Sequence, residues 1–150
     1  ARASPDPAMS GFDDARAFWD QRFAAPEYIF GTEPNRFLAS QAHRLTPGMR
    51  VLDLACGEGR NAVWLAQRGC RVTAFDISPL ALEKARRLMV ERGVEVDLRE
   101  ASVDDWRWEP GAYDAIACIF IQFAEPAQRA RLFDGFHATL AAGGLVLLQG

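Results

Sequence analysis

Residues 51–62 of this chain, VLDLACGEGRNA, decide its fold. An apolar segment at 50–54 runs into a glycine turn, and residues with helical spacing follow. Gly57 and Gly59 lack a β-carbon, so they permit a sharp turn and let a ligand approach main-chain N–H groups closely. The unpaired N–H groups of the following helix point at the turn. The stretch predicts a strand, turn and helix that bind a nucleoside-bearing cofactor; the alternative is an ordinary turn that uses glycine for geometry alone.

Composition narrows the class of protein. A length of 150 residues, 49% of them hydrophobic and 25% charged, predicts a single globular domain. A formal net charge of -3 argues against a nucleic-acid partner. No apolar run is long enough to span a bilayer and no signal core begins the chain, so no membrane partner is expected. Cys56, Cys70 and Cys118 lack C-x-x-C spacing, which predicts reduced thiols in a cytoplasmic protein without a metal site.

The chain alternates predicted strands with predicted helices. Strands are expected at residues 50–54, 71–75, 94–98, 113–120 and 145–148. One helix is expected to end near Gly69, a second to begin at Ser78 and Pro79, and a third to begin at Pro126. Alternation of this kind predicts an α/β fold, a Rossmann-like three-layer sandwich with a mostly parallel sheet and right-handed crossovers. Ligands of such sheets bind at the carboxyl ends of the strands, where strand order reverses.

Three segments are expected along the chain. Residues 1–11 form a flexible tail, 12–48 a helical or lid segment, and 49–150 the cofactor-binding domain. In the second segment, Asp13 and Asp14 precede a first helix and a second helix runs from Phe37 to Leu45.

Two cofactors fit the glycine turn taken alone. Residues 57–62 also have the G-x-G-x-x-A form of a dinucleotide fingerprint, and Asp76 lies near the position of its ribose-binding acid, about 20 residues on. An NAD-binding oxidoreductase domain therefore stays open at this point.

Longer patterns resemble one superfamily. The stretch VLDLACGEGRN, the strand VTAFD with Ile77 and Ser78 following, and LAAGGLVLL near the end resemble class I S-adenosylmethionine-dependent methyltransferases. The segment YIFGTEPN at 28–35, together with GRNA at 59–62, is similar to the small-molecule branch with tellurite-resistance and thiopurine methyltransferase-like proteins. The resemblance covers roughly residues 12–149.

The resemblance implies the binding roles. Asp53 and the backbone of Gly57–Gly59 would hold the methionine portion of S-adenosylmethionine, Asp76 the ribose hydroxyls, and Ile77 the adenine. The implied cofactor-binding set comprises Asp53, Ala55, Cys56, Gly57, Gly59, Asn61, Asp76, Ile77, Ser102, Val103 and Ile119.

Two positions depart from the resembled pattern. Ala55 stands where family members often have glycine, and Ser102 stands where they often have aspartate beside the adenine amino group. The short serine hydroxyl is a weaker acceptor, so the contact falls to the backbone of Val103 or to Asp104.

Methyl transfer depends mainly on proximity, orientation and exclusion of water, so a dedicated base is optional. Tyr28 and Gln122 are weak catalytic candidates, and Trp19, Tyr28 and Phe30 are candidates for a lid over a small-molecule acceptor. The resembled enzymes continue with two more strands, so this chain is expected to be either a fragment or a minimal version of them. A shortened sheet exposes a strand edge, which favours a homodimer or marginal stability. The alternative interpretation of the chain is a non-catalytic domain that binds the cofactor or another molecule.

Overall fold

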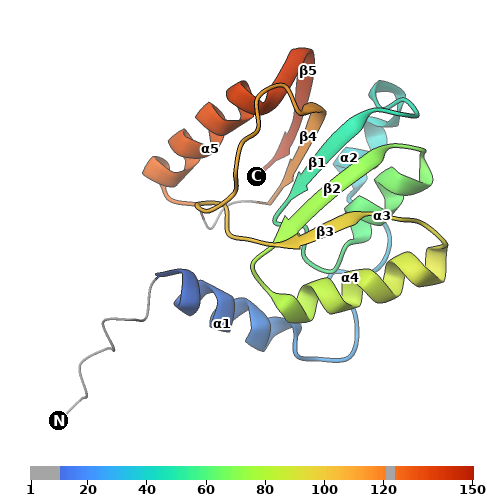
Figure 1. Cartoon of the computed structure of the whole chain (residues 1–150). Helices are drawn as coiled ribbons and strands as arrows, with labels where there is room; N and C mark the ends of the chain where they lie inside the picture. The colour runs from blue at the N-terminus through green and yellow to red at the C-terminus, as the bar shows by residue number, and fades with distance from the viewer. Residues whose placement is uncertain (1–10, 121–123) are drawn as a thin grey trace.

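A five-stranded parallel sheet forms the centre of the molecule. The computed structural model describes residues 11–120 and 124–150. Its strands are listed in chain order as β1 Arg50–Leu54, β2 Arg71–Asp76, β3 Asp97–Glu100, β4 Tyr113–Ile119 and β5 Leu140–Gln149. The spatial order is β3-β2-β1-β4-β5, with every neighbouring pair parallel (Figure 1). Strand order therefore reverses between β1 and β4, where the sequence places its glycine turn.

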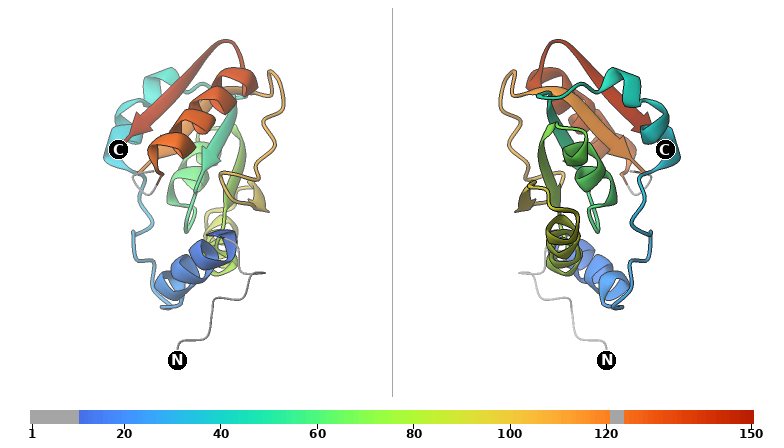
Figure 2. Two further views of the ribbon diagram at one scale, coloured as in Figure 1. Left: turned by 90° about the vertical axis from the view of Figure 1, so that its left-hand side faces the viewer. Right: turned by 90° about the vertical axis from the view of Figure 1, so that its right-hand side faces the viewer.

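Helices cover both faces of the sheet. They are α1 Gly11–Phe23, α2 Arg36–Ser40, the 3₁₀ turn η1 Ala42–Arg44, α3 Arg60–Gln67, α4 Pro79–Arg92 and α5 Pro126–Thr139. Helices α3 and α4 lie on one face and α5 on the other (Figures 1 and 2). Helix α1 packs against α4, off the carboxyl ends of the strands (Figure 1). The predicted three-layer α/β sandwich is confirmed.

Two hydrophobic cores follow from the two-residue period of the strands. Val51 joins Leu38, Leu65 and Leu82 on the α3 and α4 face. The next residue, Leu52, belongs to the opposite core, which also contains Phe75, Ile116, Leu132 and Phe136. Because successive side chains of a strand point to opposite faces, β1 is buried on both sides: Val51 belongs to one core, Leu52 and Leu54 to the other, and Asp53 is a buried polar residue between them.

Helix α4 begins and ends where the sequence predicts. The Ser78 hydroxyl accepts a hydrogen bond from the Ala81 N–H at 3.2 Å, and Pro79 occupies the first turn. Gly93 ends the helix in a left-handed conformation, with φ +66.

The third strand was predicted too early. Val94 N–H still bonds to Met89 O at 3.1 Å, so the helix-terminating turn extends past Gly93. Pairing with β2 starts only where Asp97 faces Thr73.

The last strand and the second helix also differ from prediction. Strand β5 begins at Leu140, opposite Tyr113, and a register shift places Leu145 opposite Ala115. The predicted Leu145–Leu148 is therefore only the regular part, because residues 141–144 bulge. The predicted second helix is α2 followed by η1, which tightens into a 3₁₀ turn. Asp13 and Asp14 lie inside the first turn of α1 instead of before it.

Candidate functional site

A cavity of about 760 Å³ lies at the carboxyl end of the sheet, and we call it the deep cavity. Its size suits a nucleoside-bearing ligand, since ligand pockets span roughly 300–1,000 Å³. Eight residues of the sequence-predicted binding set line it: Ala55, Cys56, Asn61, Asp76, Ile77, Ser102, Val103 and Ile119. Four separate strand ends and the turn thus meet at one ligand-sized space.

Asp76 ends β2 as a buried carboxylate, 7% exposed. Its Oδ2 accepts the Gly57 N–H and its Oδ1 accepts the Ser78 N–H, each at 2.9 Å. Burial raises the pKa of Asp76, and the N–H groups of Ser78, Gly57 and Ile77 counter the rise. These N–H groups orient the carboxylate at the cavity, where it can accept a hydrogen bond from a ligand hydroxyl.

Asp53 lies in β1 and outside the lining of the deep cavity. The side chain is buried, and its Oδ2 has no hydrogen-bond partner among the described residues. Burial, with the nearby charge of Asp76, raises the pKa of Asp53 to about 8, while Arg60 opposes the rise. An unpartnered buried carboxyl oxygen close to a ligand cavity is a group that an ammonium or hydroxyl donor can satisfy.

The glycine turn is left-handed at three positions. Gly57 has φ +56, Gly59 φ +87 and Ala55 φ 52. A β-carbon on Gly59 would lie 2.7 Å from the β-carbon of Ala85, so this glycine lets α3 approach α4. Gly57 and Gly59 do not line the deep cavity; Gly57 acts through its bond to Asp76. Ala55 occupies a conformation that favours glycine, which explains the glycine of the resembled pattern there.

The far end of the cavity is organised by the loop after β3. The Ser102 hydroxyl accepts the Asp105 N–H at 3.0 Å, so it stabilises the loop turn while lining the cavity. Trp106 stacks on Phe75, with ring centroids 4.3 Å apart, so it packs beneath this loop. Asp104 lines the cavity, and its carboxylate accepts hydrogen bonds from the side chains of Gln128 and Arg131, which lie on α5.

Aromatic residues of α1 close the opposite wall. Phe18, Trp19 and Phe23 line the deep cavity together with Phe30. Tyr28 lines neither this cavity nor the one described below; its hydroxyl donates to Lys84 O at 3.1 Å. This hydrogen bond attaches the loop that contains Tyr28 to α4. Gln122, the other catalytic candidate, lies outside the described residues.

A buried ion pair joins the glycine turn to the N-terminal segment. Glu58 Oε2 and Lys84 Nζ are 2.9 Å apart, with side-chain exposures of 1% and 4%. The two carboxylate oxygens also accept the N–H groups of Ile29 and Phe30, both at 3.1 Å. Lys84 Nζ donates to Glu27 O at 2.7 Å. Sequence reasoning missed this pair, because Lys84 lies on a helix that looks amphipathic and solvated.

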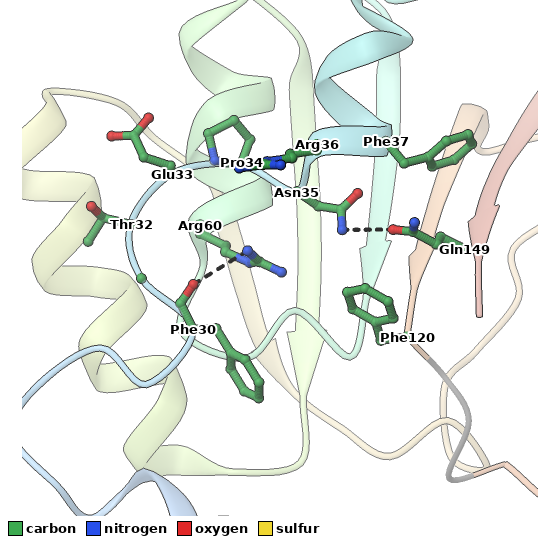
Figure 3. Close-up of a pocket in the computed structure, with 11 residues that line it drawn as sticks. Phe30, Thr32, Glu33, Pro34, Asn35, Arg36, Phe37, Arg60, Phe120 and Gln149 are labelled. Atoms are coloured by element: carbon green, nitrogen blue, oxygen red, sulfur yellow. Dashed lines mark hydrogen bonds between the residues drawn. The ribbon is translucent and has the colours of Figure 1, made fainter.

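A second cavity of about 540 Å³ adjoins the first, and we call it the rim cavity (Figure 3). Residues 30–37 form one side, and Phe120 and Gln149 stand at the ends of β4 and β5. Asn35 donates through Nδ2 to Gln149 Oε1 and through its backbone N–H to Asn61 Oδ1, both at 2.8 Å. Phe120 has φ 59, a conformation that sequence reasoning, which extended the strand through it, did not anticipate.

Fold and site together define a class: an α/β domain with a nucleoside-sized cavity at the switch point of a parallel sheet. A family model described as a methyltransferase domain matches residues 51–144. The chain belongs to this methyltransferase family, which confirms the class I resemblance. The tellurite-resistance and thiopurine-like branch remains a prediction.

Relatives with known names support the assignment. The ubiquinone biosynthesis O-methyltransferase of Xanthomonas campestris pv. campestris (strain B100) is 36% identical over 106 residues, which are 70% of this chain and 44% of the relative. The Azotobacter vinelandii protein of that name is 32% identical over 136 residues, 90% of this chain and 58% of the relative. The chain therefore spans about half the length of these relatives.

A solved structure has the same architecture. The methyltransferase from Thiobacillus denitrificans, in complex with S-adenosyl-L-homocysteine, is 26% identical with a TM-score of 0.67. The match covers 87% of this chain and 53% of that protein.

Proposed function

We propose that this protein is an S-adenosylmethionine-dependent methyltransferase acting on a small molecule. The observation that carries the proposal is the buried Asp76 carboxylate, oriented by Gly57 and Ser78 at a nucleoside-sized cavity of a methyltransferase-family domain. Vicinal ribose hydroxyls match an oriented carboxylate, because an ionised carboxyl group accepts strong hydrogen bonds from hydroxyl donors. Asp53 and the turn would hold the methionine portion, and Ile77 and Val103 would contact the adenine.

S-adenosylmethionine supplies a methyl group on a sulfonium centre, which departs as a neutral thioether. The protein then has to hold the acceptor in line and keep water away. Trp19, Phe23 and Phe30 form an apolar wall of the deep cavity that excludes water, and aromatic faces favour a nearby cation. No dedicated base is assigned, because an ionised thiol or oxyanion acceptor needs none.

Calorimetric titration with S-adenosylhomocysteine tests the cofactor. Wild-type protein should bind it saturably, and Asp76→Ala should weaken binding by at least about tenfold, the loss of roughly one charge-assisted hydrogen bond. Asp134→Ala, at an exposed position of α5, is the matched control and should leave affinity unchanged. The folded state of each variant is checked by circular dichroism.

The same titration with NAD separates the two cofactor classes. Saturable binding of NAD without heat from S-adenosylhomocysteine would overturn the proposal. Release of labelled methyl groups to thiols, oxyanions and amines then distinguishes an enzyme from a non-catalytic binding domain.

Location and assembly are further parts of the proposal. Three free, buried cysteines suit a reducing compartment such as the cytoplasm. In the described part of the chain, no helix has the length and apolar character needed to cross a membrane. Strand β5 is an edge of the described sheet, and pairing of two copies along it would give a homodimer. Sedimentation equilibrium tests this, and a strictly monomeric protein would contradict it.

A further inference from the structure

The rim cavity is separate from the residues assigned to the cofactor. Among the described residues, it shares only Phe30, Arg60 and Phe120 with the deep cavity. These three form the boundary between the cavities, so a molecule in one adjoins a molecule in the other. Direct group transfer requires two bound molecules in this kind of contact.

Arg60 brings a cation to the boundary. It begins α3, directly after Gly59, and its side chain points into the rim cavity with Phe30 on one side and Phe120 on the other (Figure 3). Burial lowers the pKa of Arg60, and the charges of Asp53 and Glu58 counter the effect. A guanidinium stays protonated even so, because its ordinary pKa is above 12.

The Arg60 guanidinium has donors to spare. Its Nη1 makes one long hydrogen bond, 3.4 Å, to Phe30 O. None of the ion pairs between described residues includes Arg60. Asp53 and Glu58 act on the half-buried Arg60 guanidinium only through space, and no described carboxylate lies within ion-pair distance of it, although buried charges are normally paired. A planar oxyanion would supply that partner in bidentate geometry.

The surroundings specify the rest of the ligand. Arg36 also lines the rim cavity. Glu33, the one acidic residue in the described part of the lining, has an 85% exposed side chain, and its Oε1 lies 4.0 Å from Nη2 of Arg92. The Phe30 and Phe120 side chains are 47% and 43% exposed. Large rings left open beside a cation favour a flat apolar body with one negative group.

We infer that the rim cavity binds the methyl acceptor, and that this acceptor is a planar apolar molecule with a carboxylate held by Arg60. The inference rests on the proposed function, because it assigns the second molecule of that reaction. It narrows the acceptor from any small molecule to aromatic acids.

Matched pairs of acceptors test the inference on protein saturated with S-adenosylhomocysteine. Protocatechuate is compared with catechol, and 3-hydroxybenzoate with phenol, by calorimetric titration. Each acid should bind at least about tenfold more tightly than its uncharged counterpart, the worth of a charge-assisted hydrogen bond. Arg60→Met should reduce that preference below about threefold, and Arg60→Lys should retain part of it. Arg87→Met removes the same charge from an exposed position of α4 and should retain the preference.

Cofactor affinity is measured separately in every variant. Equal binding of acids and neutral counterparts to the wild type would overturn the inference. So would an Arg60→Met protein that keeps the acid preference and loses affinity for S-adenosylhomocysteine, because the guanidinium would then serve the cofactor. Absence of S-adenosylhomocysteine binding to the wild type refutes the proposed function instead. The acid preference of the unloaded protein, titrated in parallel, then decides the inference on its own.

Discussion

Replacement of Lys84 by Met should destabilise the protein severely while keeping the volume of the side chain. Glu58 is 1% exposed and would lose the ammonium at 2.9 Å, leaving the carboxylate with the N–H groups of Ile29 and Phe30. Removing one partner of a buried ion pair costs about 3–5 kcal/mol. The two remaining backbone donors place this case at the low end, about 3 kcal/mol, or roughly 6–12 °C in Tm for a domain of this size.

Chemical denaturation followed by circular dichroism gives the free energy of unfolding, and two comparisons make the result specific. Arg131→Met breaks an exposed ion pair, in which the Arg131 side chain is 64% exposed and the Asp104 side chain 52%. It should lower the free energy of unfolding by at most about 1 kcal/mol. Adding Glu58→Gln to Lys84→Met removes the unpaired charge and should recover part of the loss. A Lys84→Met loss as small as that of Arg131→Met, or no recovery in the double variant, would refute the reasoning.

Three further predictions concern Gly59, Ala55 and Asp53. Gly59→Ala should lower the free energy of unfolding by about 2–4 kcal/mol, because the new side chain strains a left-handed backbone and clashes with Ala85. Gly31→Ala is the control: Gly31 is also left-handed, with φ +78, but has open space around it, so the loss should be only about 1 kcal/mol. Ala55→Gly should stabilise the protein by about 1 kcal/mol or less, because relief of φ 52 exceeds the entropy that glycine adds to the unfolded chain; a loss in denaturant melts would contradict this. Burial raises the pKa of Asp53 to about 8 from 3.8, so the folded protein holds a proton that the unfolded chain releases. Stability should therefore fall as pH rises between these values, and Asp53→Asn should flatten the decline in Tm; parallel wild-type and variant profiles would count against it.

The sequence predicted the elements that depend on local chemistry. A capping serine before proline, an apolar run before a glycine turn and a glycine after a helix each specify a backbone conformation within a few residues. Asp76 was found in the same way, because its position at a strand end follows from the alternation of strands and helices. The start of β5 was not predictable, since the register shift opposite Tyr113 depends on pairing with β4.

Contacts between distant segments escaped prediction for a similar reason. Glu58 and Lys84 each have the appearance of a solvated charge, and only the approach of α4 to the turn buries both. Tyr28 was predicted as a weak catalytic candidate and a lid residue, and the hydrogen bond from its hydroxyl to Lys84 O in α4 was not predicted. Long-range partners of polar side chains cannot be read from spacing along the chain.

Glu58 and Asn61, in and just after the glycine turn, also hold the loop beside the rim cavity in place. Glu58 accepts the N–H groups of Ile29 and Phe30, and Asn61 accepts the N–H of Asn35. The same short stretch that orients Asp76 through Gly57 therefore also holds both ends of the loop beside the rim cavity. Loosening that loop should weaken acceptor binding more than cofactor binding, because the Asp76 contacts do not pass through it. Under conditions where the Lys84→Met protein remains folded, its KM for the acceptor should accordingly rise by a larger factor than its dissociation constant for S-adenosylhomocysteine.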